Sequence, residues 1–219
     1  MNYIDLLKKI HNDVEQNDSL EILEYQFQPG LDGKHMVQKV LKLREVSPYF
    51  GSFDFADIFE FYKQCDGFKL VWQEKNVEEP RKGAIEIMSF DSVFLYTQDF
   101  INTSVENPEG TDFNGQTYPE NSFGERLMVF DSYSEFEGVA FVFDPSFKKP
   151  QLMILTDYYA VWNSSKLTDL VSYFNLLGAS RGCFTTRHKV FYKYRGDTLE
   201  PMVFNTIPYG TEFESEIFK

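Results

Sequence analysis

Three aspartates stand at or just beyond the ends of short apolar runs: Asp131, Asp144 and Asp157. Carboxylates in such positions can bind a divalent metal ion, because hard cations prefer oxygen ligands. The runs are closely spaced, which favours an antiparallel meander and puts Asp144 at the opposite end of the sheet from the other two. Asp131 and Asp157 would then stand roughly 9 to 10 Å apart, too far to share one ion. We therefore interpret all three as turn or cap residues and expect no metal or cofactor site.

Other groups that could carry catalysis are scattered along the chain. His11, His35 and His188 are isolated, without the paired spacing of a zinc site. Cys65 falls near the C-terminus of a predicted helix, on its apolar face, where no positive field activates a thiol. No nucleophile elbow, P-loop or dinucleotide fingerprint is present in the sequence. These patterns favour a non-enzymatic protein, with a metal-dependent enzyme using the strand-end aspartates as an alternative.

The composition is that of a chain with a packed core. Its 219 residues are 42% hydrophobic and 17% aromatic, which is ample for one domain. No apolar run is long enough to span a membrane, and the N-terminal segment is amphipathic, unlike a signal peptide. Two cysteines make no disulfide framework. A single domain in the cytoplasm is therefore expected.

The chain is strongly acidic, with a net charge of −13. This charge argues against nucleic-acid binding, which needs a basic surface, and is compatible with a basic protein partner. Acidity that serves only solubility is the competing explanation. The candidate partner-binding residues are the acidic side chains in or near predicted loops: Glu74, Glu78, Glu79, Glu106, Glu109, Asp112 and Glu120.

Residues 53 to 72 contain the clearest local pattern in the sequence. Apolar side chains recur at helical spacing from Phe55 to Cys65, with Asp54 as the expected N-cap. Gly67 is placed to end that helix in a left-handed conformation. Apolar and polar residues then alternate from Phe68 to Trp72, which predicts a strand with one better-buried face.

The remaining elements follow from the same two periodicities. A helix is expected over 3 to 14, a strand near 23 to 27 and a short helix within 91 to 101, while 35 to 44 fits a helix or a strand. Residues 84 to 88 form a hairpin with the strand before them, across the charged turn 74 to 83. Strands covered on both faces are expected at 127 to 130, 139 to 143 and 152 to 155. A helix over 166 to 177, capped by Ser164 or Ser165 and ended before Gly178, follows them, and residues 102 to 124 form a long loop.

Three pieces of the sequence resemble the SUKH superfamily, which includes the yeast cell-wall regulator Smi1/Knr4 and many bacterial immunity proteins. They are IFEFYKQCDGFKLVW (58 to 72), AIEIMSFDSVF (84 to 94) and the run from Leu127 to Gly182. The likeness covers roughly residues 50 to 182. Residues 1 to 49 and 183 to 219 then become N- and C-terminal extensions, with 102 to 124 as an inserted loop.

The resemblance implies an α+β domain with a mainly antiparallel, possibly mixed, sheet flanked by helices and used for binding. In bacterial members the usual role is to bind and neutralise a cognate toxin, commonly a nuclease or deaminase. An acidic immunity protein suits a basic toxin, because complementary charge speeds association. A regulatory scaffold of the Smi1/Knr4 kind is the alternative among binding proteins.

Overall fold

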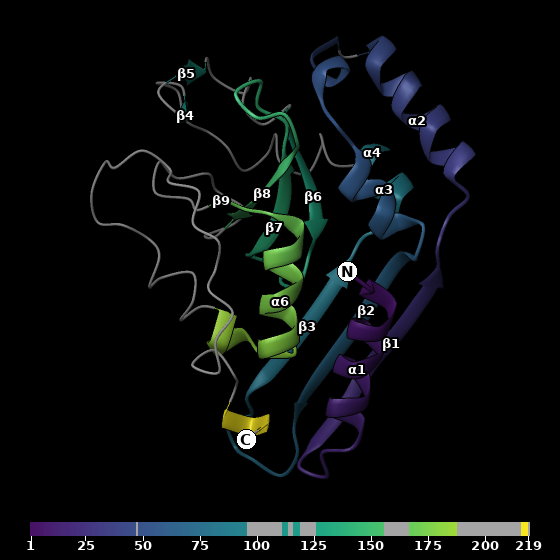
Figure 1. Ribbon diagram of the computed structural model, residues 1–219. Coiled ribbons are helices and arrows are strands. Elements are labelled where there is room, and N and C mark those ends of the chain that lie inside the picture. The colour runs from purple at the N-terminus through teal and green to yellow at the C-terminus, as the bar shows by residue number, and fades with distance from the viewer. Residues whose placement is uncertain are drawn as a thin grey trace.

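The computed structural model describes residues 1–46, 48–95, 111–113, 116–118, 126–155, 167–187 and 216–218. Its centre is a seven-stranded antiparallel sheet in the order β1-β2-β3-β6-β7-β8-β9 (Figure 1). The strands are β1 (Leu20–Pro29), β2 (Cys65–Glu74), β3 (Lys82–Ile87), β6 (Leu127–Asp131), β7 (Gly138–Val142), β8 (Gln151–Leu155) and β9 (Leu167–Thr168). A separate small hairpin pairs β4 (Thr111–Phe113) with β5 (Gln116–Tyr118). The predicted α+β class with an antiparallel sheet is confirmed.

The described helices pack into the main core, on one face of the sheet. The described α-helices are α1 (Tyr3–Glu15), α2 (Gly33–Val46), α3 (Ala56–Tyr62), α4 (Phe90–Leu95) and α6 (Leu170–Ser180), with short 3-10 turns at Pro48–Ser52 and Glu216–Phe218. Helices α1 and α6 lie side by side in front of the sheet, and Gly178 of α6 faces Leu6 of α1 (Figure 1). The ambiguous segment 35 to 44 belongs to a helix, and the predicted helix 3 to 14 is confirmed.

The meander β6-β7-β8 is buried on both faces, as its apolar sequence predicts. One set of alternating side chains, including Phe130 and Phe141, joins the main core under α6. The other set, including Val129 and Met153, joins a second cluster on the opposite face. Strand β2 differs, because Phe68, Leu70 and Trp72 point into the core and the residues between them are only partly buried.

The predicted end of the helix before Gly67 is wrong. Helix α3 ends at Tyr62, whose carbonyl accepts a hydrogen bond from Leu31 N–H at 2.8 Å, so the chain turns early into β2. Gly67 is therefore a strand residue opposite Gln28, and Cys65 is the first residue of β2. Asp54 accepts from Ala56 N–H at 2.9 Å, so it does bond to the first residue of α3.

The last helix also begins later than predicted. Asp169 caps α6 by accepting from Ser172 N–H at 2.7 Å, and Leu167–Thr168 before it pairs with β8 as a strand. Gly178 lies inside the helix, and Arg181, with a left-handed φ of 49°, ends it. The predicted caps Ser164 and Ser165 lie outside the described residues.

The sheet is nearly divided between β3 and β6, which pair only through Ile87 and Asp131. Residues 181 to 187, which we call the closing segment, occupy the space where the strands diverge. Gly182 O accepts from Ala84 N–H at 3.0 Å, and the backbone of Cys183 forms an isolated antiparallel β-bridge with Gly83. Gly182 has a φ of 77°, and a Cβ there would stand 2.8 Å from the Ala84 carbonyl oxygen. Only a glycine fits this approach to β3 without strain.

Candidate partner-binding hairpin

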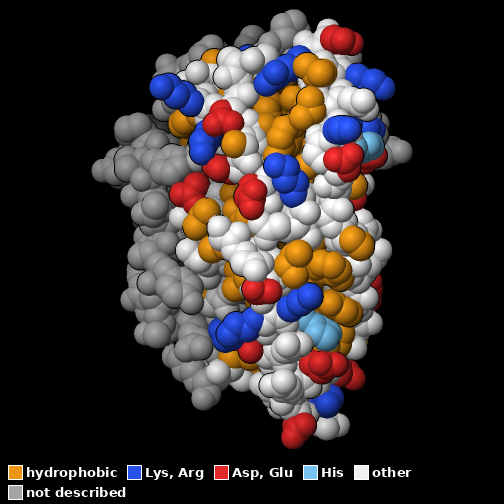
Figure 2. Space-filling model, turned by 45° about the vertical axis from the view of Figure 1, so that its right-hand side comes forward, with side chains coloured by type: hydrophobic (Ala, Val, Ile, Leu, Met, Phe, Trp, Pro, Cys, Tyr) orange, Lys and Arg blue, Asp and Glu red, His pale blue; other side chains and the backbone are white. Residues whose placement is uncertain are grey.

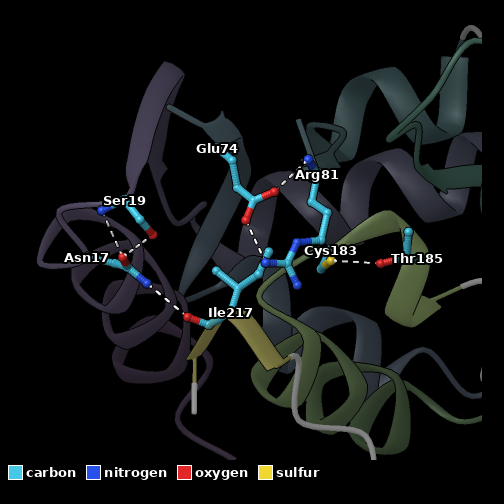
Figure 3. A network of polar contacts seen from close by, with 7 residues as sticks. All are labelled: Asn17, Ser19, Glu74, Arg81, Cys183, Thr185 and Ile217. Atoms are coloured by element: carbon cyan, nitrogen blue, oxygen red, sulfur yellow. Dashed lines mark hydrogen bonds and ion pairs between the residues drawn. The ribbon is translucent and has the colours of Figure 1, made fainter. Parts of the chain in front are cut away.

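Glu74 and Arg81 close the β2–β3 hairpin, as Figure 3 shows. The Glu74 carboxylate accepts from the Arg81 guanidinium at 2.6 Å and from the Arg81 backbone N–H at 2.9 Å. The hydrogen bond from Arg81 lowers the pKa of Glu74 below its ordinary value. This candidate residue is therefore committed to its own hairpin.

Residues 75 to 80 form the tip of this hairpin, at the lower end of the molecule in Figure 1. Asn76 has a left-handed φ of 58°, and Val77 is 50% exposed beside the exposed Glu78 and Glu79. Lys75 ties the tip to the α1–β1 turn, because its N–H donates to Ser19 O at 2.8 Å and its ammonium to Asp18 O at 3.2 Å. The tip thus presents one apolar side chain and two carboxylates on a fixed loop.

The charge around the tip is balanced overall. Residues 74 to 82 hold three glutamates and three basic residues, and Arg81 is paired with Glu74. Across the described residues, Glu78 and Glu79 form no ion pair within 4 Å. Negative charge available to a partner is therefore concentrated at these two side chains.

The other candidate acids are not brought to this surface by the described structure. Asp112 lies on β4, paired with Thr117 of β5. Glu106, Glu109 and Glu120 lie outside the described residues. The seven candidates therefore divide into a hairpin group and a group that no described contact joins to it.

The predicted turn or cap role is wrong for Asp131, which is fully buried. Its two oxygens accept from Glu86 N–H at 2.8 Å and from the Arg187 guanidinium at 2.8 Å, and the Tyr173 hydroxyl also donates to it. Arg187 donates in addition to Ala84 O at 2.8 Å, so it joins β3 to β6 where the strands diverge. Burial alone would lower the pKa of Arg187, but the adjacent oxygens of Tyr173 and Asp131 raise it. Asp131 and Arg187 therefore form a buried structural ion pair.

Asp144 does have the predicted turn role, since it accepts from Ser146 N–H at 2.9 Å. The β6–β7 register places it at the opposite end of that strand pair from Asp131, as expected. Asp157 lies outside the described residues. Over the part of the chain that the structure describes, no three His, Cys, Asp or Glu side chains gather into a potential metal site.

Cys65 is buried, and its thiol donates to Gly67 O at 3.3 Å. Burial raises the pKa of this thiol to about 11. The thiolate is therefore suppressed at neutral pH, which disfavours a nucleophilic role.

A second surface was not anticipated from the sequence, because 35 to 44 fitted two structures. Helix α2 buries Met36 and Val40 and leaves Val37 and Leu41 about half exposed, at 46% and 50%. The exposed Lys34 lies on the same helical stripe, and the exposed Lys42 follows Leu41, about 100° around the helix. Figure 2 shows hydrophobic side chains gathered between basic ones over this part of the molecule.

A shallow hollow of about 200 Å³ lies on the polar face of β1–β3, beside α4. Gly67 and Phe68 line it together with polar side chains, among them Gln28, Lys69 and Ser92. The ammonium of Lys69 is held by Glu24 at 2.8 Å and Glu86 at 3.4 Å. Its charge is therefore already balanced within the sheet.

The chain was compared with protein-family models, curated proteins and solved structures. None of the three comparisons found a match. Among helices within the described residues, none is both long enough and apolar enough to cross a bilayer.

Proposed function

We propose that this chain is a non-enzymatic binding protein of the SUKH type that captures and neutralises a basic toxin domain. The observation that carries the proposal is the fixed hairpin tip, where Val77 lies beside the exposed carboxylates of Glu78 and Glu79. Protein interfaces commonly combine an apolar centre with a polar rim. Complementary charges would steer a basic partner toward it.

The order of elements supports the SUKH part of the proposal. The three resembling pieces correspond to α3 with β2, β3 with α4, and β6-β7-β8 with α6. The expected helix–strand, strand–helix and meander–helix units therefore lie around one sheet. This likeness is one of architecture, and the choice of partner depends on the tip.

Co-expression with the product of each adjacent gene tests the proposal, which requires one of these products to be a toxin. We expect the chain to bind that toxin and restore growth, and expect Glu78→Lys/Glu79→Lys to slow association and to weaken its dependence on salt. The matched control is Glu45→Lys/Glu135→Lys, which changes net charge equally at two other exposed glutamates. Absence of binding by the unchanged chain contradicts the toxin proposal. Equal association rates for the two double variants would show that the tip is not part of the interface.

The α2 surface favours a second candidate function, a regulatory scaffold. Val37 and Leu41 provide an exposed apolar stripe, with the exposed Lys34 one turn before Val37. An apolar surface on α2, apart from the hairpin tip, suits a protein that holds two different partners. A scaffold would bind several endogenous proteins and give no protection against the neighbouring toxin.

A further inference from the structure

The turn Glu216–Phe218 occupies a defined position at the base of the sheet, close to the β2–β3 hairpin (Figures 1 and 3). The Phe218 ring meets the Trp72 ring edge to face, with centroids 5.6 Å apart. The Arg181 guanidinium lies over the Phe218 ring, 5.2 Å from the ring centroid. Asn17 donates to the backbone oxygen of Ile217 at 3.0 Å. We call Asn17, Trp72 and Arg181 the socket.

Each socket residue is also held by hydrogen bonds or ion pairs that do not involve Phe218. Trp72 is fully buried, and its indole N–H donates to Arg181 O at 2.8 Å. The Arg181 guanidinium is held by Asp13 at 2.9 Å and by the Ala179 carbonyl at 3.0 Å. The socket therefore has a rigid aromatic wall and a rigid cationic wall.

The amide of Asn17 is oriented by its own turn. Its oxygen accepts from Ser19 N–H at 3.0 Å and from the Ser19 hydroxyl at 2.6 Å, which turns the NH₂ group toward Ile217 (Figure 3). An amide N–H oriented in this way can donate to the backbone carbonyl of a peptide, whichever side chain that peptide residue carries. The Trp72 indole and the Arg181 guanidinium favour an aromatic ring in the socket. Aromatic pairs favour edge-to-face contact, and a cation is attracted to the face of a ring.

We propose that the socket is a peptide-binding site for an aromatic residue and the backbone carbonyl before it, and that the chain's own Ile217–Phe218 is its reversible occupant. The contacts come from three segments far apart in sequence, and Asn17 and Ile217 are 200 residues apart. The site is separate from Val77, Glu78 and Glu79, and it holds whether or not the hairpin tip binds a toxin.

The test removes the ring that fills the socket and supplies the segment as a separate molecule. The probe is a fluorescein-labelled peptide of residues 211–219, TEFESEIFK, followed by fluorescence anisotropy with the full-length protein. A ligand on the same chain acts at an effective concentration on the order of 1 mM, so a peptide with a dissociation constant near ~0.1 mM should bind the unchanged chain about tenfold more weakly than Phe218→Ala.

Three controls separate recognition from general disruption. Phe136→Ala removes an exposed phenylalanine elsewhere and should bind the peptide as weakly as the unchanged chain. The peptide TEFESEIAK should fail to bind Phe218→Ala, because it lacks the ring. Phe218→Leu, which keeps an apolar side chain but removes the ring, should gain less affinity for TEFESEIFK than Phe218→Ala and serves if that variant does not fold.

Equal affinity of TEFESEIFK for the unchanged chain and for Phe218→Ala would overturn the proposal. So would equal binding of the two peptides by Phe218→Ala, or, if that variant does not fold, no gain in peptide binding by Phe218→Leu. No toxin enters the experiment, so its failure leaves the proposed function of the hairpin tip unaffected.

Discussion

The Arg187 guanidinium lies 2.8 Å from a carboxylate oxygen of Asp131, and both side chains are completely buried. Arg187 belongs to the closing segment and Asp131 ends β6, so this pair holds the late part of the chain against the middle of the sheet. The Arg187 guanidinium also lies 3.5 Å above the Tyr133 ring.

Replacing Arg187 with Met should strongly destabilise the protein, because it leaves the Asp131 charge buried without a cation. Breaking a buried ion pair in this way costs about 3–5 kcal/mol. Urea denaturation measures the change in the free energy of unfolding. The double variant Arg187→Met/Asp131→Leu should lose less than Arg187→Met alone, and a loss equal to or larger than that of the single variant would contradict the charge explanation.

Gly182→Ala should destabilise the contact between the closing segment and β3. The substitution adds a Cβ 2.7 Å from the Ile85 side chain at a left-handed φ, and such strain costs on the order of 1–3 kcal/mol. Thermal unfolding provides the measurement. Gly51→Ala is the matched control, because a Cβ there meets nothing within 4 Å, and an equal effect of both variants would refute the steric argument.

Stability should fall as the pH rises from 9 to 11, in part because of Cys65. The thiol pKa is about 11 in the folded protein against 9.0 for an ordinary thiol, so the unfolded chain loses its proton first. Between these two pKa values the folded state keeps the thiol proton that the unfolded state has lost. The contribution of Cys65 to the free energy of unfolding therefore decreases with pH, by on the order of 2 kcal/mol. Urea denaturation at pH 8 to 11 should show a smaller decrease for Cys65→Ala. A decrease of the same size in both proteins would exclude the thiol as its source.

The Glu74–Arg81 pair should be visible in a carboxylate titration. Arg81 lowers the Glu74 pKa, so the pair stabilises the fold above the ordinary carboxyl pKa and loses this effect as the pH falls through the lowered value. Arg81→Ala should raise the Glu74 pKa in an NMR titration, with a stability loss of no more than about 1 kcal/mol for this partly exposed pair. An unchanged Glu74 pKa would show that the ion pair is not formed in solution.

Periodicity predicted most elements, and it failed where a distant contact decides the outcome. The helix 3 to 14, the β2–β3 hairpin and the β6-β7-β8 meander depend on local alternation, and all are confirmed. The end of α3 depends on Leu31, whose N–H donates a hydrogen bond to the Tyr62 carbonyl. No pattern near Gly67 contains that information.

The candidate site was predictable in part for the same reason. Charge and turn composition indicated Glu78 and Glu79, which are exposed at the tip. The commitment of Glu74 to Arg81 depends on the hairpin register. The burial of Asp131 with Arg187 depends on the path of the chain after α6, and a single sequence does not contain that path.

The near-division of the sheet between β3 and β6 bears on how the protein is made. Arg187 follows Asp131 by 56 residues, so a ribosome completes strands β1 to β9 before it adds the cation that Asp131 needs. Until then the nascent chain holds two half-sheets joined at one residue pair, with a carboxylate facing the space between them. Completion of this fold therefore has to wait for the closing segment to leave the exit tunnel.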